Sequence, residues 1–567
     1  MRLLRAGILI LFALLYTGLN ALTPLKIDDA AYICYVRQIA GHPFDPYGFV
    51  IQWYDVPQPA NDVLAPPVLP YSVALGMHFF GENPALLKLS LLPWVLLLTF
   101  ALNAHLRRFA PGLELELTAF LLFSPALLPS LNLMLDVPAL ALSLSAVFLF
   151  LLACDTNSLG RAALAGLTAG VAMQTKYTGI VSIGAMAAAS LVYRRPTLGL
   201  AAAASAAPVF ISWEIFVAIL YGRSHFLTSL GANSSTFEEK ISLIPIFFSQ
   251  FGGVAAALAL LGLAAAGWSK RTIVAASGGI VLAYAAVALL DANYEGVVHP
   301  SALLFGDNAA AHWKIQLAEI LFDVFSGVCG IALIRAIGRL WTESAVPVRA
   351  DTRFLLAWLV VDATAYVVLT PFPALRRVLG VFVILTLVFG RLAARTCTTA
   401  ERSRVLRGVV AFGCLLGLGF YAIDWLDARP FRDGAEQASA FVNANGGGRV
   451  WYNGRWGFRY YAERCGMLPV VPRYEASSAY LELPSASRME SGDWLVIAEE
   501  PERNPDLDVA ALPLEKMTQI VIDDRLPLRT VPCFYVGRTP LEHRETPRLT
   551  IVIYRITREC AADICDD

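Results

Sequence analysis

Apolar stretches long enough to cross a lipid bilayer recur along the first three quarters of the chain, from Ala6 to Ile423, and then stop. A hydrocarbon core roughly 30 Å thick requires about 20 residues per helix, and inside it helices satisfy their own backbone hydrogen bonds. The composition agrees, because 57% of the residues are hydrophobic and only 16% are charged. We therefore expect a polytopic α-helical membrane protein.

Basic residues orient the expected helices, because Lys and Arg accumulate on cytoplasmic loops. Arg2 and Arg5 place the N-terminus in the cytoplasm, and the first helix is expected to be a retained anchor because no small-residue cleavage site follows it. When the later basic clusters are also placed in the cytoplasm, the apolar stretches between them give about thirteen spans. These are Ala6–Leu22, Leu86–Leu102, Leu117–Leu133, Val137–Cys154, Ala162–Gln174, Tyr177–Tyr193, Leu198–Leu220, Ile241–Trp268, Ile273–Leu290, Ile315–Ile334, Phe354–Leu369, Val378–Leu392 and Val409–Ile423.

An odd number of spans places the C-terminus outside the cytoplasm. The expected location is the inner membrane of a bacterial cell. We predict a transmembrane domain over residues 1–424, with an extracytoplasmic first loop at 24–85. The segment Pro66–Gly81 within this loop is too short for a secure span and is predicted to be an interfacial helix. Residues 425–567 are predicted to form an extracytoplasmic soluble α/β domain.

This soluble domain has a regular pattern of helix and strand signals. A helix is predicted over Ala435–Asn445, and strands follow at Arg449–Tyr452, Trp494–Ala498, Gln519–Ile522, Cys533–Val536 and Leu549–Tyr554. Its aromatic residues can stack on sugar rings or form a packed core; they are Trp451, Tyr452, Trp456, Tyr460 and Tyr461. Its cysteines, Cys465, Cys533, Cys560 and Cys565, can form disulfides or remain free thiols. The net charge of −1 gives no indication of nucleic-acid binding.

Three acidic or basic positions are predicted to meet at the outer face of the membrane. They are Asp28-Asp29 after the first helix, Asp136 between two helices, and Lys176 between two more. Charged groups at membrane depth cost several kcal/mol unless they are paired or hydrated, so they indicate a functional cavity. Asp28 or Asp29 can accept a proton from a hydroxyl group, or can cap the following helix. Asp136 also has a capping position, and Lys176 can hold a phosphate or extend to the lipid headgroups.

Other polar residues give less specific indications of function. Arg376 and Arg377 lie on the predicted outer side against the charge bias, which favours an anionic partner such as a lipid phosphate. His225 can ligate a metal, contact phosphate or be an ordinary loop histidine. Glu214 and Asp362 fall within predicted spans and require partners inside the bundle.

The order of these motifs resembles that of the C-type membrane glycosyltransferases (GT-C), which include the protein O-mannosyltransferases and the lipid A aminoarabinose transferase. The resemblance rests on Asp28-Asp29, Pro66-Pro67 to Tyr71, Leu135-Asp136-Val137-Pro138 and Gly166 to Tyr177, and more weakly on Pro371 to Gly380. The chain departs from the family pattern at Asp29, where glutamate is common, and at Arg376-Arg377, where Arg-Tyr is frequent.

This resemblance implies inverting transfer of a sugar from a polyprenyl-phosphate donor to an extracytoplasmic lipid, polysaccharide or protein. It implies that Asp28 is the catalytic base and that Asp29 and Asp136 are further acidic groups of the site. Lys176, Tyr177, Arg376 and Arg377 would hold the lipid phosphate. A divalent metal assists some family members, and His225 is the candidate ligand here. The alternative is a transporter or flippase of a lipid-linked saccharide, which internal repeats would favour; we find none in the sequence.

Overall fold

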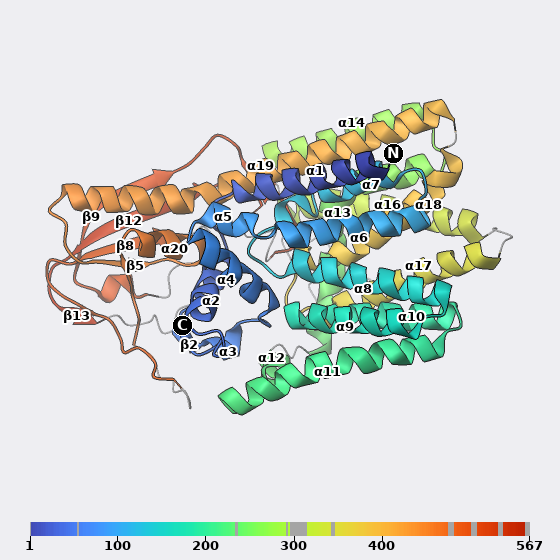
Figure 1. Cartoon of the computed structure of the whole chain (residues 1–567). Coiled ribbons are helices and arrows are strands. Elements are labelled where there is room, and N and C mark those ends of the chain that lie inside the picture. Colours follow the sequence, from blue (N-terminus) through green and yellow to red (C-terminus); the bar gives the residue numbers. More distant parts are fainter. Residues whose placement is uncertain are drawn as a thin grey trace.

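The computed structural model describes residues 2–53, 56–232, 236–290, 293–294, 315–341, 346–397, 399–473, 481–499, 507–530 and 537–561. It consists of a long helical bundle at one end and a sheet at the other, with the helices of the first loop between them (Figure 1).

The bundle confirms the predicted polytopic helical fold. Ten helices of the described residues are long and apolar enough to cross a membrane. They are α1 (Arg2–Ala21), α5 with α6 (Pro84–Leu89 and Leu92–Phe109), α8 (Asp136–Thr156), α11 (Pro196–Tyr221), α13 (Phe237–Ala265), α14 (Lys270–Leu289), α16 (Leu317–Trp341), α17 (Val346–Leu369), α18 (Leu379–Thr396) and α19 (Ala400–Ala444).

The other three predicted spans form shorter helices, so the expected number of about thirteen exceeds the number of long ones. The segment predicted as Leu117–Leu133 forms α7 (Glu114–Leu122) and the short 3₁₀ helix η1 (Leu128–Ser130), because Pro125 and Pro129 interrupt the helical hydrogen bonds. The other two segments form α9 (Leu159–Thr175), and η2 (Tyr177–Ile180) followed by α10 (Val181–Val192).

The first loop is a folded layer. It contains α2 (Asp29–Gly41), the β1–β2 pair (Val50–Ile51 and Gln58–Pro59), α3 (Ala60–Val63) and α4 (Val68–Phe80), which corresponds to the predicted interfacial helix. Figure 1 shows α2 and α4 between the helical bundle and the C-terminal sheet. The loop is thus placed to join the two parts of the molecule.

The C-terminal sheet has the strand order β6-β5-β8-β12-β9. Its strands are β5 (Val450–Asn453), β6 (Leu468–Pro469), β8 (Trp494–Glu499), β9 (Leu514–Ile522) and β12 (Leu549–Ile556). β5 runs parallel to β6 and β8, whereas β12 is antiparallel to both of its neighbours. The helix α20 (Trp456–Arg464) connects β5 to β6. This mixed α/β arrangement confirms the predicted class of the C-terminal domain.

Smaller elements complete the fold. They are α12 (His225–Ala232), the β3–β4 pair (Asn293–Tyr294 and Ile315–Gln316), η4 (Leu375–Arg377), the β7–β13 pair (Arg488–Met489 and Cys560–Ala561), η5 (Val509–Ala511) and the β10–β11 pair (Leu528–Arg529 and Glu542–His543). Cys465 and Cys560 are free thiols, and Cys533 and Cys565 lie outside the described residues. The predicted strand Cys533–Val536 also lies outside them.

One continuous helix joins the bundle to the sheet. α19 has 45 residues and so extends about 68 Å, more than twice the thickness of a hydrocarbon core. Its C-terminal half packs closely on the sheet at Gly434, where an added Cβ would lie 2.5 Å from Cδ1 of Ile551. The domain boundary predicted after residue 424 falls within this helix and remains a prediction.

Candidate functional site

A cavity of about 670 Å³ lies where the first loop meets the ends of several bundle helices. Its charged and hydroxyl-bearing lining includes most of the predicted site residues, namely Asp28, Asp136, Lys176, Tyr177, Arg376 and Arg377. Much of the remaining lining is apolar and includes Ile180, Ile183, Phe210, Ile211, Leu230 and Val368. The cleft can therefore hold a molecule with an anionic head and a hydrocarbon tail.

Five of the charged side chains reach this cleft from breaks in helical structure or from helix ends. Asp28 lies in the turn between α1 and α2, Asp136 is the first residue of α8, and Lys176 follows the last residue of α9. Arg376 and Arg377 lie in η4, between α17 and α18. Within the described residues, the Asp28 side chain makes no capping hydrogen bond to α2. Its carboxylate is therefore available to the cleft.

Asp28, Asp136, Arg376 and Lys176 form a connected ionic cluster. Arg376 Nη1 lies 3.2 Å from Asp28 Oδ2 and 4.0 Å from Asp136 Oδ2. Lys176 forms an ion pair with Asp136, so its side chain turns into the protein and not toward the lipid headgroups. Burial raises the pKa of Asp28, and Arg376 opposes this shift in part. Asp136 thus has two cationic neighbours, whereas Asp28 has one, Arg376, among the described residues.

The cleft carries more positive than negative charge. Arg377 stacks on Phe372, with Cζ 4.4 Å from the ring centroid, and its buried Nε has no hydrogen-bond partner among the described residues. Lys240 also lines the cleft and donates a hydrogen bond of 2.7 Å to the carbonyl oxygen of Thr370. Four cations therefore accompany the two carboxylates. This arrangement favours a phosphate, to which guanidinium and ammonium groups donate strong hydrogen bonds.

Asp29 does not line this cleft, although it is adjacent to Asp28 in the sequence. Its buried carboxylate forms an ion pair of 3.2 Å with Lys88 and accepts a hydrogen bond of 2.9 Å from the backbone amide of Leu133. Lys88 also donates to the carbonyl oxygens of Thr23 and Pro24. These contacts give Asp29 a role in holding the first loop on the bundle.

Tyr177 and His225 belong to a neighbouring polar cluster. The Tyr177 hydroxyl group donates a hydrogen bond of 3.0 Å to Glu214, whose partners the sequence did not indicate, and also contacts Nδ1 of His225. Nε2 of His225 contacts the carbonyl oxygen of Leu64. Both ring nitrogens are thus engaged, and no group of three His, Cys, Asp or Glu side chains in the described ranges is arranged to hold a metal ion. These residues do not fit a metal at His225.

The C-terminal domain contacts the segment that leads to Asp28. The backbone amide of Leu25 donates a hydrogen bond of 2.9 Å to the Tyr461 hydroxyl group in α20. Gly457 lies so close to this segment that an added Cβ would be 2.4 Å from the carbonyl oxygen of Leu25. Ile27 has a φ of 45° and Trp456 a φ of 52°, and such left-handed conformations are strained in bulky residues. The two segments are therefore held in unusual conformations on either side of one contact.

Some residues of the site were not indicated by the sequence. Lys240 follows two glutamates, a pattern typical of a solvent-exposed charge. Phe372 is one of many aromatic residues in the chain. The sequence indicates Tyr461 only as a sugar-stacking or core residue, whereas in the structure it is buried and bonds to Leu25 in the segment before Asp28. The sequence does indicate Arg376 and Arg377, because basic residues are uncommon on the predicted outer side of the membrane.

The chain was compared with known proteins and solved structures. No protein-family model and no curated protein sequence matches the chain. ArnT from Cupriavidus metallidurans in the apo state is similar at 13% identity, with a TM-score of 0.45, over 97% of this chain and 98% of that one. ArnT bound to undecaprenyl phosphate is similar at 16% identity, with a TM-score of 0.41, over 96% and 98% of the two chains.

The Archaeoglobus fulgidus oligosaccharyltransferase in complex with Zn and sulfate is also similar, at 13% identity and a TM-score of 0.43. The match covers 82% of this chain and spans 62% of the length of the oligosaccharyltransferase. All three TM-scores are below 0.5, so the function proposed below rests on the geometry of the cleft.

Proposed function

We propose that the protein is an integral membrane glycosyltransferase that transfers a sugar from a polyprenyl-phosphate donor to an extracytoplasmic acceptor. The observation that carries this proposal is the meeting of Asp28 with Lys176, Arg376 and Arg377 in one cavity that also has a large apolar wall. An isoprenoid chain suits the apolar wall, and its phosphate suits the cations. A carboxylate beside this phosphate site can act on the acceptor.

In this mechanism Asp28 accepts the proton of an acceptor hydroxyl group as its oxygen attacks the anomeric carbon of the donor. Attack comes from the face opposite the bond between this carbon and the phosphate oxygen, so the new glycosidic bond has the inverted configuration. The lipid phosphate leaves with the electron pair of the broken bond. Lys176, Arg376 and Arg377 stabilise its charge, because preformed donors in a site with little water act strongly on developing charge.

Asp28 is a better candidate for the base than Asp136. Asp136 is held in an ion pair with Lys176, whereas Asp28 has a pKa raised by burial. A base with a raised pKa takes up a proton more readily at neutral pH. We therefore assign Asp136 the role of holding Lys176 and Arg376 in place.

The test uses the purified protein in lipid nanodiscs with radiolabelled polyprenyl-phosphate sugars and membrane acceptors. We expect labelled product with inverted anomeric configuration, and a loss of about 100-fold or more in Asp28→Asn. Asp155→Asn is the matched control, because Asp155 lies about 30 Å along α8 from Asp136 and pairs with Arg108.

Two results would contradict the proposal. Transfer that persists in Asp28→Asn excludes Asp28 as the base. If the labelled donor crosses the membrane of proteoliposomes and no sugar is transferred, the protein is a flippase and not a transferase.

A further inference from the structure

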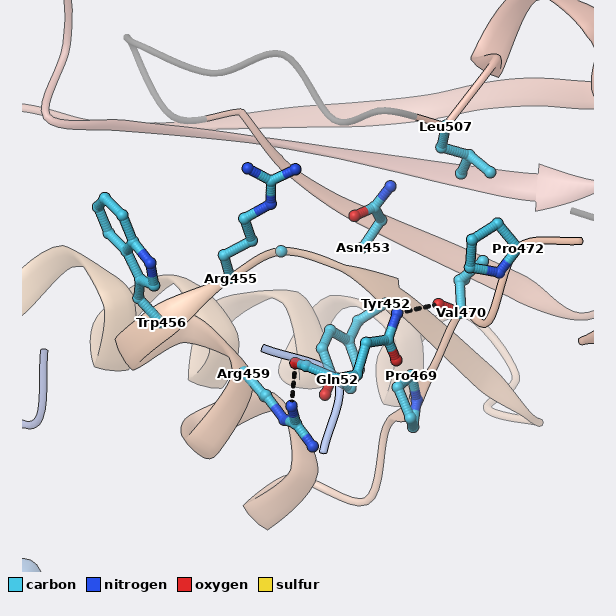
Figure 2. Close-up of a pocket in the computed structure, with 11 residues that line it drawn as sticks. Gln52, Tyr452, Asn453, Arg455, Trp456, Arg459, Pro469, Val470, Pro472 and Leu507 are labelled. Atoms are coloured by element: carbon cyan, nitrogen blue, oxygen red, sulfur yellow. Dashed lines mark hydrogen bonds between the residues drawn. The ribbon is translucent and has the colours of Figure 1, made fainter. Parts of the chain in front are cut away.

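The C-terminal domain contains a second hollow, shown in Figure 2. It lies at the carboxyl end of β5, where this strand runs parallel to β6 and β8, and open sheets commonly bind ligands at such strand ends. Its wall comes from the β5–α20 connection, from the first loop through Gln52, and from segments at Pro469–Pro472 and Leu507. None of these residues belongs to the cleft around Asp28.

The lining combines polar and flat apolar groups. Asn453 and Gln52 contribute amides, Arg455 and Arg459 contribute guanidinium groups, and Trp456 contributes an indole ring that Figure 2 shows apart from the other labelled side chains. The hollow has a volume of about 40 Å³. One water molecule requires about 10–15 Å³ on this measure, so the hollow admits a few hydroxyl groups at the edge of a sugar unit.

The hollow is physically linked to the catalytic cleft. Gln52 Nε2 donates a hydrogen bond of 2.9 Å to the carbonyl oxygen of Val470, and Arg459 donates to the backbone oxygen of Gln52, as the dashed lines in Figure 2 show. The next residue, Trp53, lines the cleft together with Asp28. Two consecutive residues of the first loop, Gln52 and Trp53, therefore line the hollow and the cleft, respectively.

Helix α20 provides a second link. Trp456 and Arg459 of this nine-residue helix line the hollow, whereas Gly457 and Tyr461 contact Leu25 and the segment before Asp28. A shift of α20 in response to a ligand would therefore reach the loop that carries Asp28.

We propose that this hollow binds the edge of a sugar unit in the acceptor and that α20 couples its occupancy to the position of Asp28. The proposal names a saccharide-containing acceptor, and in this respect it rests on the proposed transferase function. The Asn453 amide can bind a hydroxyl group, and the indole of Trp456 can pack on the apolar face of a sugar ring. The C-terminal domain then selects the acceptor, while the bundle holds the donor.

The first experiment measures binding without any donor, so that its outcome does not depend on catalysis. Cellobiose, chitobiose and a galacturonate disaccharide are titrated into the full-length protein in nanodiscs by calorimetry. We expect at least one to bind, with affinity reduced fivefold or more in Asn453→Ala and in Trp456→Ala. Asn445→Ala and Trp268→Ala are the matched controls, because both lie outside the hollow. Asp28→Asn should bind the saccharide as the wild type does.

The second experiment tests the role of the hollow in transfer. In Asn453→Ala, which removes only an amide, we expect a higher KM for the acceptor, whereas Asn445→Ala should keep the KM of the wild type. The proposal is overturned if none of the three disaccharides binds, or if binding is equal in the wild type and Asn453→Ala. Binding with no sugar release from any donor would instead contradict the transferase function alone.

Discussion

The hydroxyl group of Tyr461 accepts a hydrogen bond of 2.9 Å from the backbone amide of Leu25, three residues before Asp28. This bond ties α20 of the C-terminal domain to the turn that presents Asp28 to the cleft. Gly457 packs against the same turn, so the contact extends over one face of the helix. The position of Asp28 therefore depends on residues more than 400 positions away in the sequence.

Tyr461→Phe removes this hydrogen bond while keeping the ring. A buried hydrogen bond contributes about 1 kcal/mol, so we expect kcat to fall by about fivefold as the Asp28 turn loosens. The KM for the donor should stay unchanged, because Tyr461 does not line the cleft. Steady-state kinetics with Tyr460→Phe as the neighbouring control check this. Equal kcat values in the two variants would remove Tyr461 as a positioning residue.

The sequence predicted the bundle well because long apolar stretches are a direct signature of membrane helices. All ten long helices correspond to predicted spans. The prediction was less accurate at Leu117–Leu133, where hydrophobicity alone does not reveal that Pro125 and Pro129 break the helix.

The site was partly predictable for a similar reason. Asp28, Asp136 and Lys176 are charges beside apolar stretches, and they do line one cavity. The different environments of Asp28 and Asp29 were not predictable, because successive residues at a helix start point in different directions. Nor does any local pattern relate Leu25 to Tyr461, which meet only through tertiary packing.

The pH dependence of transfer should report the environment of Asp28. Burial raises its pKa above the usual value of about 3.9, so the carboxylate is lost at a higher pH than for an exposed aspartate as the pH falls. We expect the acid limb of kcat/KM to lie above pH 4. Arg376→Gln should move this limb to still higher pH, because Arg376 lowers the pKa of Asp28. A limb that stays in place or moves to lower pH in Arg376→Gln would contradict this assignment.

Arg377→Gln should weaken donor binding without destabilising the fold. Arg377 stacks on Phe372 and forms no ion pair with a carboxylate of the described residues, so its removal leaves no buried acid unpaired. A charge-assisted hydrogen bond contributes about 1.5–3 kcal/mol, which corresponds to an increase in the donor KM of about 10-fold or more. Arg404→Gln, at an exposed site in α19, is the control. An unchanged donor KM would exclude Arg377 from the phosphate site.

Lys176→Met should differ from Arg377→Gln in stability. Removing Lys176 breaks its ion pair with Asp136 and leaves Arg376 4.0 Å from the Asp136 carboxylate, and breaking a buried ion pair costs about 3–5 kcal/mol. We expect a lower thermal unfolding midpoint in detergent together with weaker donor binding. Lys516→Met, in an exposed part of β9, should change neither property. A stable Lys176→Met protein with normal donor binding would contradict the roles assigned to both Lys176 and Asp136.

Asp29→Asn tests whether the two adjacent aspartates have separate roles. Asp29 and Lys88 are almost completely buried, so neutralising the carboxylate leaves the Lys88 ammonium group with backbone carbonyl partners alone among the described residues. We expect a loss of about 3–5 kcal/mol in the free energy of unfolding. Glu82→Gln, which disrupts the partly exposed pair with Arg37, should cost less than about 1 kcal/mol. Asp28→Asn, in contrast, should lose transfer activity and leave the ion pair between Asp29 and Lys88 intact. If Asp29→Asn were as stable as the wild type but inactive, Asp29 and not Asp28 would be the better candidate for the base.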